Sequence, residues 1–284
     1  MSLLYKINMN TPITYYGGKQ RIAGEILSMI PSHKIYCEPY FGGGAVFFRK
    51  PKAGIEVIND HDNNLINFYL CVQNHFGELQ RLIDNTLHSE AMYYYAKDIW
   101  NGRVEVSDIE KAWAVWMITN GSFNGSMYGG WKWCNGTSGS HSGIYLKNKR
   151  SEFTLKLRDR LEHVQISCRE AIQVIQGRDS VDTFFYLDPP YPGSNQQHYS
   201  GYTHKDFYEL LQLLSVIKGK FILSNYWSQT LKYHVAKYKW NIKSIDVNIK
   251  IANLNKRNRR EQTVQSRKEI LVYNYDIEKT LFDL

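Results

Sequence analysis

The residues of this chain best suited to chemistry form the tetrapeptide Asp188-Pro189-Pro190-Tyr191, which directly follows an apolar run at 183–187. Two consecutive prolines fix the backbone and remove two N–H donors, so the carbonyl oxygens of Asp188 and Pro189 are left to accept hydrogen bonds from a substrate. Open α/β sheets bind their ligands at the carboxyl ends of strands, where this tetrapeptide would stand. The alternative is an ordinary proline-rich strand exit. Against it, an acid, a rigid turn rich in acceptors and an aromatic ring converge here.

A glycine cluster indicates a second site, for a nucleotide cofactor. Gly42-Gly43-Gly44 follows the apolar run 34–37, and Asp60 comes about 18 residues later, after the next apolar run. Glycines let the backbone approach a ligand closely, and an acid at this spacing can accept hydrogen bonds from ribose hydroxyls. The alternative is a glycine turn that only tightens a corner between a strand and a helix.

Strand and helix signals alternate towards both ends of the chain, which predicts an α/β fold with a mostly parallel sheet. The apolar runs at 34–37 and 55–58 predict strands, and a helix is expected after each, at 45–48 and at 65–70. Later strands are expected at 183–187, 221–224, 245–249 and 270–273. The last two flank a polar, basic stretch, so we expect them to form a long antiparallel hairpin.

Two further helical features can be located. Thr203 with Asp206 resembles a capping box, so a helix is predicted to begin there, with a buried face that includes Tyr208, Leu211 and Leu214. From about residue 78 to about residue 160 the chain is predicted to be mainly helical around a loop rich in Gly, Ser, Asn and Trp. We interpret 78–160 as an inserted domain. The catalytic domain would then comprise 1–77 and 161–284.

Composition narrows the class of protein. The chain has 284 residues, 43% of them hydrophobic, and no apolar run approaches the roughly 20 residues that span a bilayer. The N-terminus lacks the features of a secretory signal, so we expect a cytoplasmic protein. A net charge of +8 favours a polyanionic partner such as DNA or RNA. The four cysteines are widely spaced, which predicts reduced and mostly buried thiols and no metal site.

Five segments, in order, resemble the D12 class of DNA N6-adenine methyltransferases, the group that includes the adenine methylases acting on GATC. They are an N-terminal cofactor motif, a Glu-Pro-Phe-x-Gly-x-Gly motif, an acidic end to the second strand, a catalytic signature and the strand that follows it. In this chain they read Tyr15-Tyr16-Gly17-Gly18-Lys19, Glu38-Pro39-Tyr40-Phe41-Gly42-Gly43-Gly44, Asn59-Asp60, Asp188-Pro189-Pro190-Tyr191 and Phe221-Ile222-Leu223-Ser224-Asn225.

The resemblance implies a Rossmann-like methyltransferase sheet, S-adenosylmethionine as cofactor and methyl transfer to N6 of an adenine flipped out of duplex DNA. It implies that Asp60 binds the ribose hydroxyls and that Asp188 lies between the cofactor and the target amine, with Pro189, Pro190 and Tyr191 completing the catalytic site. The implied cofactor-binding residues are Tyr15, Tyr16, Gly17, Lys19, Glu38, Pro39, Phe41, Gly42, Gly44, Asp60 and Asp188.

DNA contacts are expected from two places. Within the insertion, the loop around Phe123, Asn124 and Tyr128 resembles the hairpin with which the GATC enzymes probe DNA. Phe123 would wedge into the gap left by the flipped base and Asn124 would contact the backbone. Tyr128 falls where those enzymes tend to place a base-reading arginine, so the resemblance does not carry the GATC target over. The tip of the C-terminal hairpin would grip phosphates through its basic side chains, Lys256, Arg257, Arg259 and Arg260 among them.

Other readings of the same fold stay open at this point. Enzymes that methylate cytosine N4 usually carry Ser or Thr in place of Asp188, and those that methylate RNA or a protein amide would favour Asn there. A catalytically silent DNA-binding relative is the third alternative, which the intact Lys19, Asp60 and Asp188 oppose. None of the cysteines follows a proline, so attack on cytosine C6 is not expected. We expect a monomer, and the sequence leaves open whether a cognate endonuclease accompanies it.

Overall fold

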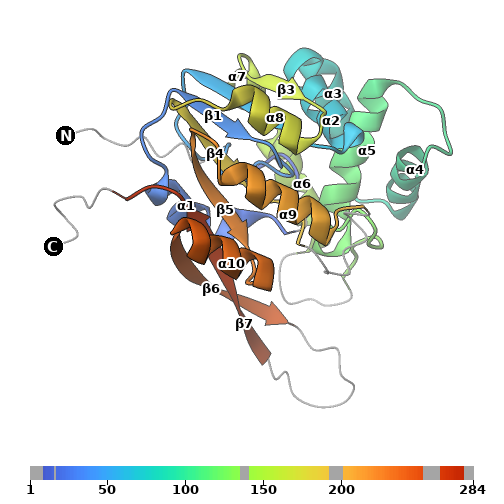
Figure 1. The fold of residues 1–284 in the computed structure, drawn as a ribbon. Helices are drawn as coiled ribbons and strands as arrows, with labels where there is room; N and C mark the ends of the chain where they lie inside the picture. Colours follow the sequence, from blue (N-terminus) through green and yellow to red (C-terminus); the bar gives the residue numbers. More distant parts are fainter. Residues whose placement is uncertain (1–8, 16, 135–140, 192–200, 252–262, 278–284) are drawn as a thin grey trace, which may run out of the picture.

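The computed structural model describes residues 9–15, 17–134, 141–191, 201–251 and 263–277. These residues form a seven-stranded sheet with the order β3-β2-β1-β4-β5-β7-β6 (Figure 1). Every neighbouring pair from β3 to β5 is parallel, whereas β7 runs antiparallel to both β5 and β6. The predicted α/β fold, mostly parallel with a C-terminal antiparallel hairpin, is confirmed. The strands are β1 (Ile35–Glu38), β2 (Ile55–Asn59), β3 (Gln165–Ser167), β4 (Thr183–Leu187), β5 (Lys220–Asn225), β6 (Asn241–Ile251) and β7 (Thr263–Tyr273).

The central strand β4 explains how the sequence builds this sheet. All five of its residues are buried, as expected of a parallel strand covered on both faces. Phe184 and Tyr186 pack into one apolar core, and Phe185 and Leu187 into a second core on the opposite face. This alternation places β4 between two layers of helices.

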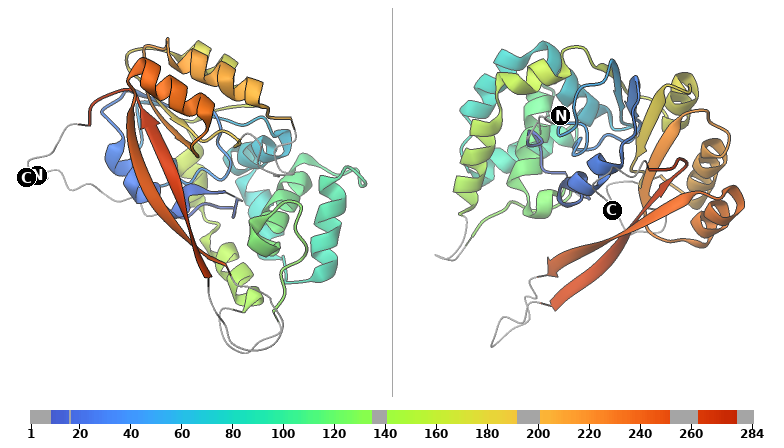
Figure 2. Two further views of the ribbon diagram at one scale, coloured as in Figure 1. Left: turned by 60° about the horizontal axis from the view of Figure 1, so that its bottom comes forward. Right: turned by 90° about the vertical axis from the view of Figure 1, so that its left-hand side faces the viewer.

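The two helical layers differ in size, as the right-hand view of Figure 2 shows. One face of the sheet carries α8 (Ala171–Arg178), α9 (His204–Leu214) and α10 (Gln229–Tyr238). The other is covered by a larger group. Its members are α1 (Ala23–Met29), α2 (Asn63–Asn74), α3 (Phe76–Asp84), α4 (Glu90–Trp100), α5 (Asp108–Gly121), α6 (Ser142–Glu152), α7 (Leu155–Leu161) and the short 3₁₀ turns η1 (Lys19–Arg21) and η2 (Phe123–Gly125).

Helix α5 is the centre of the larger group. A capping box between Ser107 and Glu110 starts it, and every residue from 112 to 121 is buried. It contacts α2, α3 and α4, and its apolar side chains belong to the same core as those of the sheet. The region 78–160 is therefore helical as predicted. Because its core is continuous with that of the sheet, the domain boundaries at 78 and 160 stay a prediction.

The helix predicted directly after the glycine cluster is not formed. The stretch 45–48 after the glycine cluster forms turns instead of a regular helix, because Val46, Phe47 and Phe48 are all buried and Pro51 ends the segment. Helix α9 does begin at the capping box of Thr203 and Asp206.

The buried face of α9 includes Leu211 and Leu214 as predicted, but it does not include Tyr208. Phe207, Leu210, Leu211 and Leu214 are buried at helical spacing, whereas Tyr208 is half exposed.

The cysteine prediction was half right. Cys37 and Cys71 are buried free thiols, but Cys134 and Cys168 are exposed.

A buried ion triad joins the helices to the sheet. Glu56 of β2 accepts hydrogen bonds from Lys50 and from Arg160 of α7. The Arg160 guanidinium also donates to the Phe47 carbonyl at 3.0 Å and lies 3.6 Å from the centre of that residue's ring. All three charged side chains are at most 5% exposed. Burial alone would raise the pKa of Glu56, but the bonds from Arg160 and Lys50 outweigh it and lower the pKa.

Candidate active site

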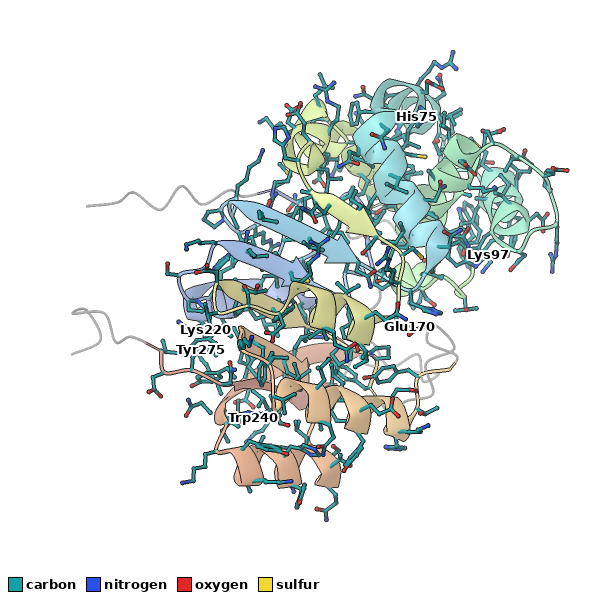
Figure 3. All side chains as sticks on the ribbon, turned by 45° about the horizontal axis from the view of Figure 1, so that its top comes forward. His75, Lys97, Glu170, Lys220, Trp240 and Tyr275 are labelled. Carbon is teal, nitrogen blue, oxygen red and sulfur yellow. The ribbon has the colours of Figure 1, made fainter. Side chains whose placement is uncertain are left out.

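The carboxyl ends of the parallel strands gather the predicted site residues along one edge of the sheet. Glu38 ends β1, Asp60 follows β2, and Asp188 follows β4. Strand β1 lies between β2 and β4, where the strand order reverses. Ligands of open α/β sheets bind at such a switch point. In Figure 3 the parallel strands run from the side on which Lys220 and Tyr275 are labelled towards the side of Glu170 and Lys97.

The N-terminal motif packs onto the glycine loop. A Cβ atom at Gly42 would lie 3.1 Å from the ring of Tyr15, and one at Gly43 would lie 2.9 Å from the Cβ of Tyr15. Gly42 and Gly44 have positive φ angles, which favour glycine. Two segments far apart in the sequence thus form one surface made largely of backbone. Such a surface suits the close approach of a nucleotide cofactor.

We expect Gly44→Ala to lower the free energy of unfolding by about 2–4 kcal/mol. Its new Cβ would lie 2.5 Å from the Phe41 ring and 3.0 Å from Phe48, at a φ of +65°. Urea unfolding measures the change. Gly77→Ala in α3 is the matched control, because its Cβ would meet open space and alanine favours a helix by up to about 1 kcal/mol. Equal stability of the two variants would contradict the packing described here.

Asp60 is the acid that supports the loop. Its Oδ2 accepts the Gly42 N–H at 2.8 Å and its Oδ1 accepts the Asp62 N–H at 3.0 Å. Burial raises its pKa to about 6, against the opposing effect of these backbone bonds. The carboxylate is therefore charged at neutral pH and suited to accept hydrogen bonds from ribose hydroxyls, as the sequence predicted.

Asn59, just before it, belongs to one of the five motifs, but the sequence analysis gave it no role. Its amide donates to the Pro39 carbonyl at 3.0 Å and to the Arg169 carbonyl at 2.9 Å, and its oxygen accepts from Ser167 and from the Arg169 N–H. These four bonds fix the chain after β1, β2 and β3 relative to one another. The ring of Phe41, by contrast, is buried against Tyr69, so only the backbone of this predicted residue can face a ligand.

Glu38 is buried at the end of β1, where its Oε2 accepts the Tyr36 hydroxyl at 2.7 Å. Burial raises its pKa to about 8, and the neighbouring Asp188 adds to the rise. Between its ordinary value of 4.5 and about 8, the folded state holds a proton that the unfolded chain has lost. The free energy of unfolding must therefore fall as the pH rises through this window.

Glu38→Gln should remove this pH dependence. We expect the difference in melting temperature, variant minus wild type, measured without ligands, to increase as the pH rises from 5 to 8 (roughly the window just derived). Glutamine keeps the acceptor for Tyr36 and cannot ionise. Calorimetry at several pH values measures the difference. A difference that does not change with pH would argue against a protonated Glu38.

The tetrapeptide Asp188-Pro189-Pro190-Tyr191 meets Lys19 in a cluster of polar side chains. Lys19 Nζ donates to Asp188 Oδ1 at 2.7 Å, to Asp188 Oδ2 at 2.9 Å and to the Tyr191 hydroxyl at 2.7 Å. Burial would lower the pKa of Lys19, but Asp188 and Glu269 together raise it. Burial raises the pKa of Asp188, with Lys19 opposing the rise. Pro189 is buried, and the ring of Tyr191 lies 4.5 Å from that of Tyr226.

Glu269 of β7 is a member of this cluster that the sequence analysis missed. Its Oε1 accepts the Tyr191 and Ser224 hydroxyls, both at 2.7 Å, and lies 3.5 Å from Lys19 Nζ. Its side chain is 6% exposed. The only signal for it in the sequence is an acid directly before the apolar run 270–273, on the edge of a basic stretch.

The predicted DNA-probing loop lies beside the N-terminal motif. η2 contains Phe123 and Asn124, and a Cβ at Gly125 would lie 2.8 Å from the Thr14 side chain. Phe123 is 60% exposed and Tyr128 is 50% exposed. Lys97 Nζ lies 6.0 Å from the centre of the Tyr128 ring, so this ring also packs on its own domain, and the DNA-probing role stays a prediction.

Five predicted residues, Tyr16, Lys256, Arg257, Arg259 and Arg260, lie outside the described residues. The described strands β6 and β7 are each 11 residues long and project from the rest of the molecule in Figure 1 and in the right-hand view of Figure 2. Within the described part of the chain, no group of three or more His, Cys, Asp or Glu side chains is arranged to hold a metal ion. None of the described helices is long and apolar enough to cross a membrane.

The sequence profile of the D12 class N6 adenine-specific DNA methyltransferases matches residues 15–249, which include the whole of strands β1 to β5. This chain belongs to that family. It is an adenine-specific DNA methyltransferase, its cofactor is S-adenosylmethionine and its partner is DNA. The family prediction made from the five motifs is confirmed.

Three named relatives illustrate the family. The chain is 28% identical over 235 residues to the type II methyltransferase M1.LlaDCHI of Lactococcus lactis subsp. cremoris, covering 73% of this chain and 75% of the relative. It is 29% identical over 198 residues to the DNA N-6-adenine-methyltransferase of Escherichia phage P1, covering 67% of this chain and 25% of that longer protein. It is 26% identical to the type II methyltransferase M.MjaIII of Methanocaldococcus jannaschii, covering 69% of this chain and 74% of the relative.

Proposed function

We propose that Asp188 and the Pro189 carbonyl hold the N6 amine of an adenine turned out of duplex DNA while Tyr191 stacks on the base. The observation that supports this most is the cluster at the end of β4. There Asp188 and Tyr191 meet Lys19, on the same sheet edge as the glycine loop bonded to Asp60. The acceptor-rich turn and the nucleotide-binding surface thus adjoin.

The chemistry of the target explains why these groups are needed. The N6 lone pair of adenine is delocalised into the ring, so the amine is a poor nucleophile until its hydrogens are held and the nitrogen becomes more tetrahedral. Asp188 and Pro189 offer the two acceptors. Asp188 would also take the proton that the nitrogen loses when it is methylated. S-adenosylmethionine supplies the methyl group as a sulfonium. Positioning and fixed charge provide most of the rate, and no covalent enzyme intermediate forms.

The cofactor residues form a set that fits this molecule. Asp60, charged at neutral pH, would accept the ribose hydroxyls, and the backbone of Gly42 and Gly44 would allow close contact. Tyr15 would cover the same surface. The buried Glu38, next to Asp188, would face the positively charged end of the ligand. Gly17, Lys19 and Pro39 would complete the site from neighbouring turns.

DNA would be held by the helical insertion and the hairpin. We assign target recognition to 78–160, with the exposed Phe123 entering the gap left by the flipped base, and Asn124 and Tyr128 beside it. Base flipping costs a few kcal/mol, which stacking on Tyr191 would offset. The hairpin strands β6 and β7 would carry the basic tip to the phosphates.

Replacing Arg257, Arg259 and Arg260 together by glutamine should weaken binding to all duplexes alike. Each lost phosphate contact lowers the slope of log K against log salt by about 0.9, so we expect a decrease of roughly 3. Filter binding or fluorescence anisotropy at several salt concentrations measures it. Lys34, Lys52 and Lys220, exposed at the amino ends of β1, β2 and β5, form a matched control triple. Unchanged affinity at moderate salt would refute the phosphate role of the tip.

The proposed function is tested by incubating the protein with a methyl-labelled cofactor and unmodified duplex DNA, and then analysing the modified nucleosides. We expect N6-methyladenine only. N4-methylcytosine, or labelling of RNA in place of DNA, would overturn the proposal. Mapping the modified adenines in cells that express the protein would identify the recognised sequence.

We further propose that the chain acts as a monomer in the cytoplasm. Two of its relatives are named type II methyltransferases, which supports a place in a restriction-modification system with a cognate endonuclease. Analytical ultracentrifugation with and without a target duplex tests the first point. The place in a restriction-modification system is tested by asking whether the DNA of cells that express the protein resists cleavage by a restriction endonuclease.

A further inference from the structure

Lys19 lies between two carboxylates, the partly exposed Asp188 of the sequence motifs and the buried Glu269. Lys19 Nζ bridges both oxygens of Asp188, at 2.7 and 2.9 Å, and lies 3.5 Å from Glu269 Oε1. The side chains of Lys19 and Glu269 are 8% and 6% exposed. A charge so buried needs a partner in every state of the site, because an unpaired one is costly.

This arrangement weakens Asp188 as an acceptor while Lys19 stays on it. In the proposed mechanism Asp188 must accept a hydrogen bond from the adenine amine and then its proton. A carboxylate keeps free lone pairs beside the two bonds from Lys19, but the bound ammonium stabilises its charged form and makes it a poorer base. Asp188 therefore accepts the amine and its proton better once another group holds Lys19.

We infer that Glu269 is a positioning residue that receives the Lys19 ammonium when the target amine takes its place on Asp188. The inference rests on the proposed function. The Glu269 carboxylate is held in place by the Tyr191 and Ser224 hydroxyls. The 3.5 Å separation need only shorten to the roughly 2.8 Å of a charge-assisted bond. The ammonium is then passed from one acid to the other without ever being unpaired.

Glu269→Gln separates this role from a structural one. Glutamine keeps an acceptor for Tyr191 and Ser224 but lacks the charge that receives an ammonium. Lys19 would stay on Asp188, and we expect kcat to fall about 10- to 100-fold while KM for DNA and cofactor affinity stay within about threefold. Glu25→Gln, which removes an exposed acid paired with Lys243, controls for the change in net charge and should behave as the wild type.

The Lys19→Met background provides the decisive comparison. If Glu269 acts through Lys19, Glu269→Gln should change kcat by less than about threefold once Lys19 is gone. An equal loss in both backgrounds would show a purely structural role and overturn the inference. Full activity of Glu269→Gln in the Lys19 background would overturn it too. A wild type that fails to methylate DNA would instead refute the proposed function itself.

A direct measurement needs no variant. We expect a crystal structure of the wild type with S-adenosylhomocysteine and a duplex containing the mapped target adenine to show Lys19 Nζ bonded to Glu269, with Asp188 facing the adenine amine. Lys19 still bridging the two oxygens of Asp188, with the adenine in place, would overturn the inference.

Discussion

Asp188→Ala is expected to lower kcat for methyl transfer by about 10³-fold or more, with DNA affinity within about threefold of the wild type. The change removes both the acceptor for the target amine and the acceptor for its proton. Lys19 keeps a buried acid beside it in Glu269, so the site is not left with an uncompensated charge. Single-turnover methylation measures the rate, and anisotropy with the same duplex measures the binding.

Two variants make this result specific. Asp188→Asn retains one acceptor oxygen but takes up a proton poorly, so its rate should lie between those of the alanine variant and the wild type. Asp182→Ala removes an acid just before the opposite end of the same strand, where it pairs with the exposed Lys34, and should leave the rate unchanged. Wild-type turnover of Asp188→Ala would remove the proposed mechanism.

Glu56→Ala should produce the largest loss of stability, about 3–5 kcal/mol in the free energy of unfolding. It leaves Lys50 and Arg160 buried, close together and without their shared acid. Urea unfolding followed by circular dichroism measures the loss. Because Arg160 belongs to α7 and Glu56 to β2, the variant also weakens the attachment of the helical region to the sheet.

An exposed ion pair supplies the comparison. Arg103 and Asp98 lie 2.9 Å apart, but both are largely in solvent, so Asp98→Ala should cost no more than about 1 kcal/mol. Replacing Lys50, Glu56 and Arg160 together by apolar residues of similar size should recover much of the loss, since no charge is then left buried. A Glu56→Ala variant as stable as Asp98→Ala would show that the triad does not stabilise the fold.

The sequence predicted those parts of the fold that depend on local pattern. The apolar run before Asp188 became a fully buried central strand, and the pair Thr203 and Asp206 marked the first turn of α9. Four of the five motifs lie within a strand or at its end, and the first contacts two of these ends through Tyr15 and Lys19. Parallel strands then bring these ends to one edge whatever the lengths of the segments between them.

The remaining features depend on pairing between distant segments. Glu269 became part of the site only because β7 pairs with β5 in one register, with Ile270 opposite Asn225. No pattern within 263–273 fixes that register. Asn59 likewise has a function only through partners after β1 and β3. Tyr208 was assigned to the buried face because an aromatic residue at that spacing resembles a core position, whereas Phe207 fills it.

The hairpin has a geometrical consequence for the active site. Ile270 is the first residue of β7 that pairs with β5, whereas the backbone of Glu269 pairs with Ile245 of β6 alone. The free part of the hairpin thus begins at the residue whose carboxylate faces Lys19. The segment expected to contact DNA and the acid beside the active site therefore belong to one continuous strand.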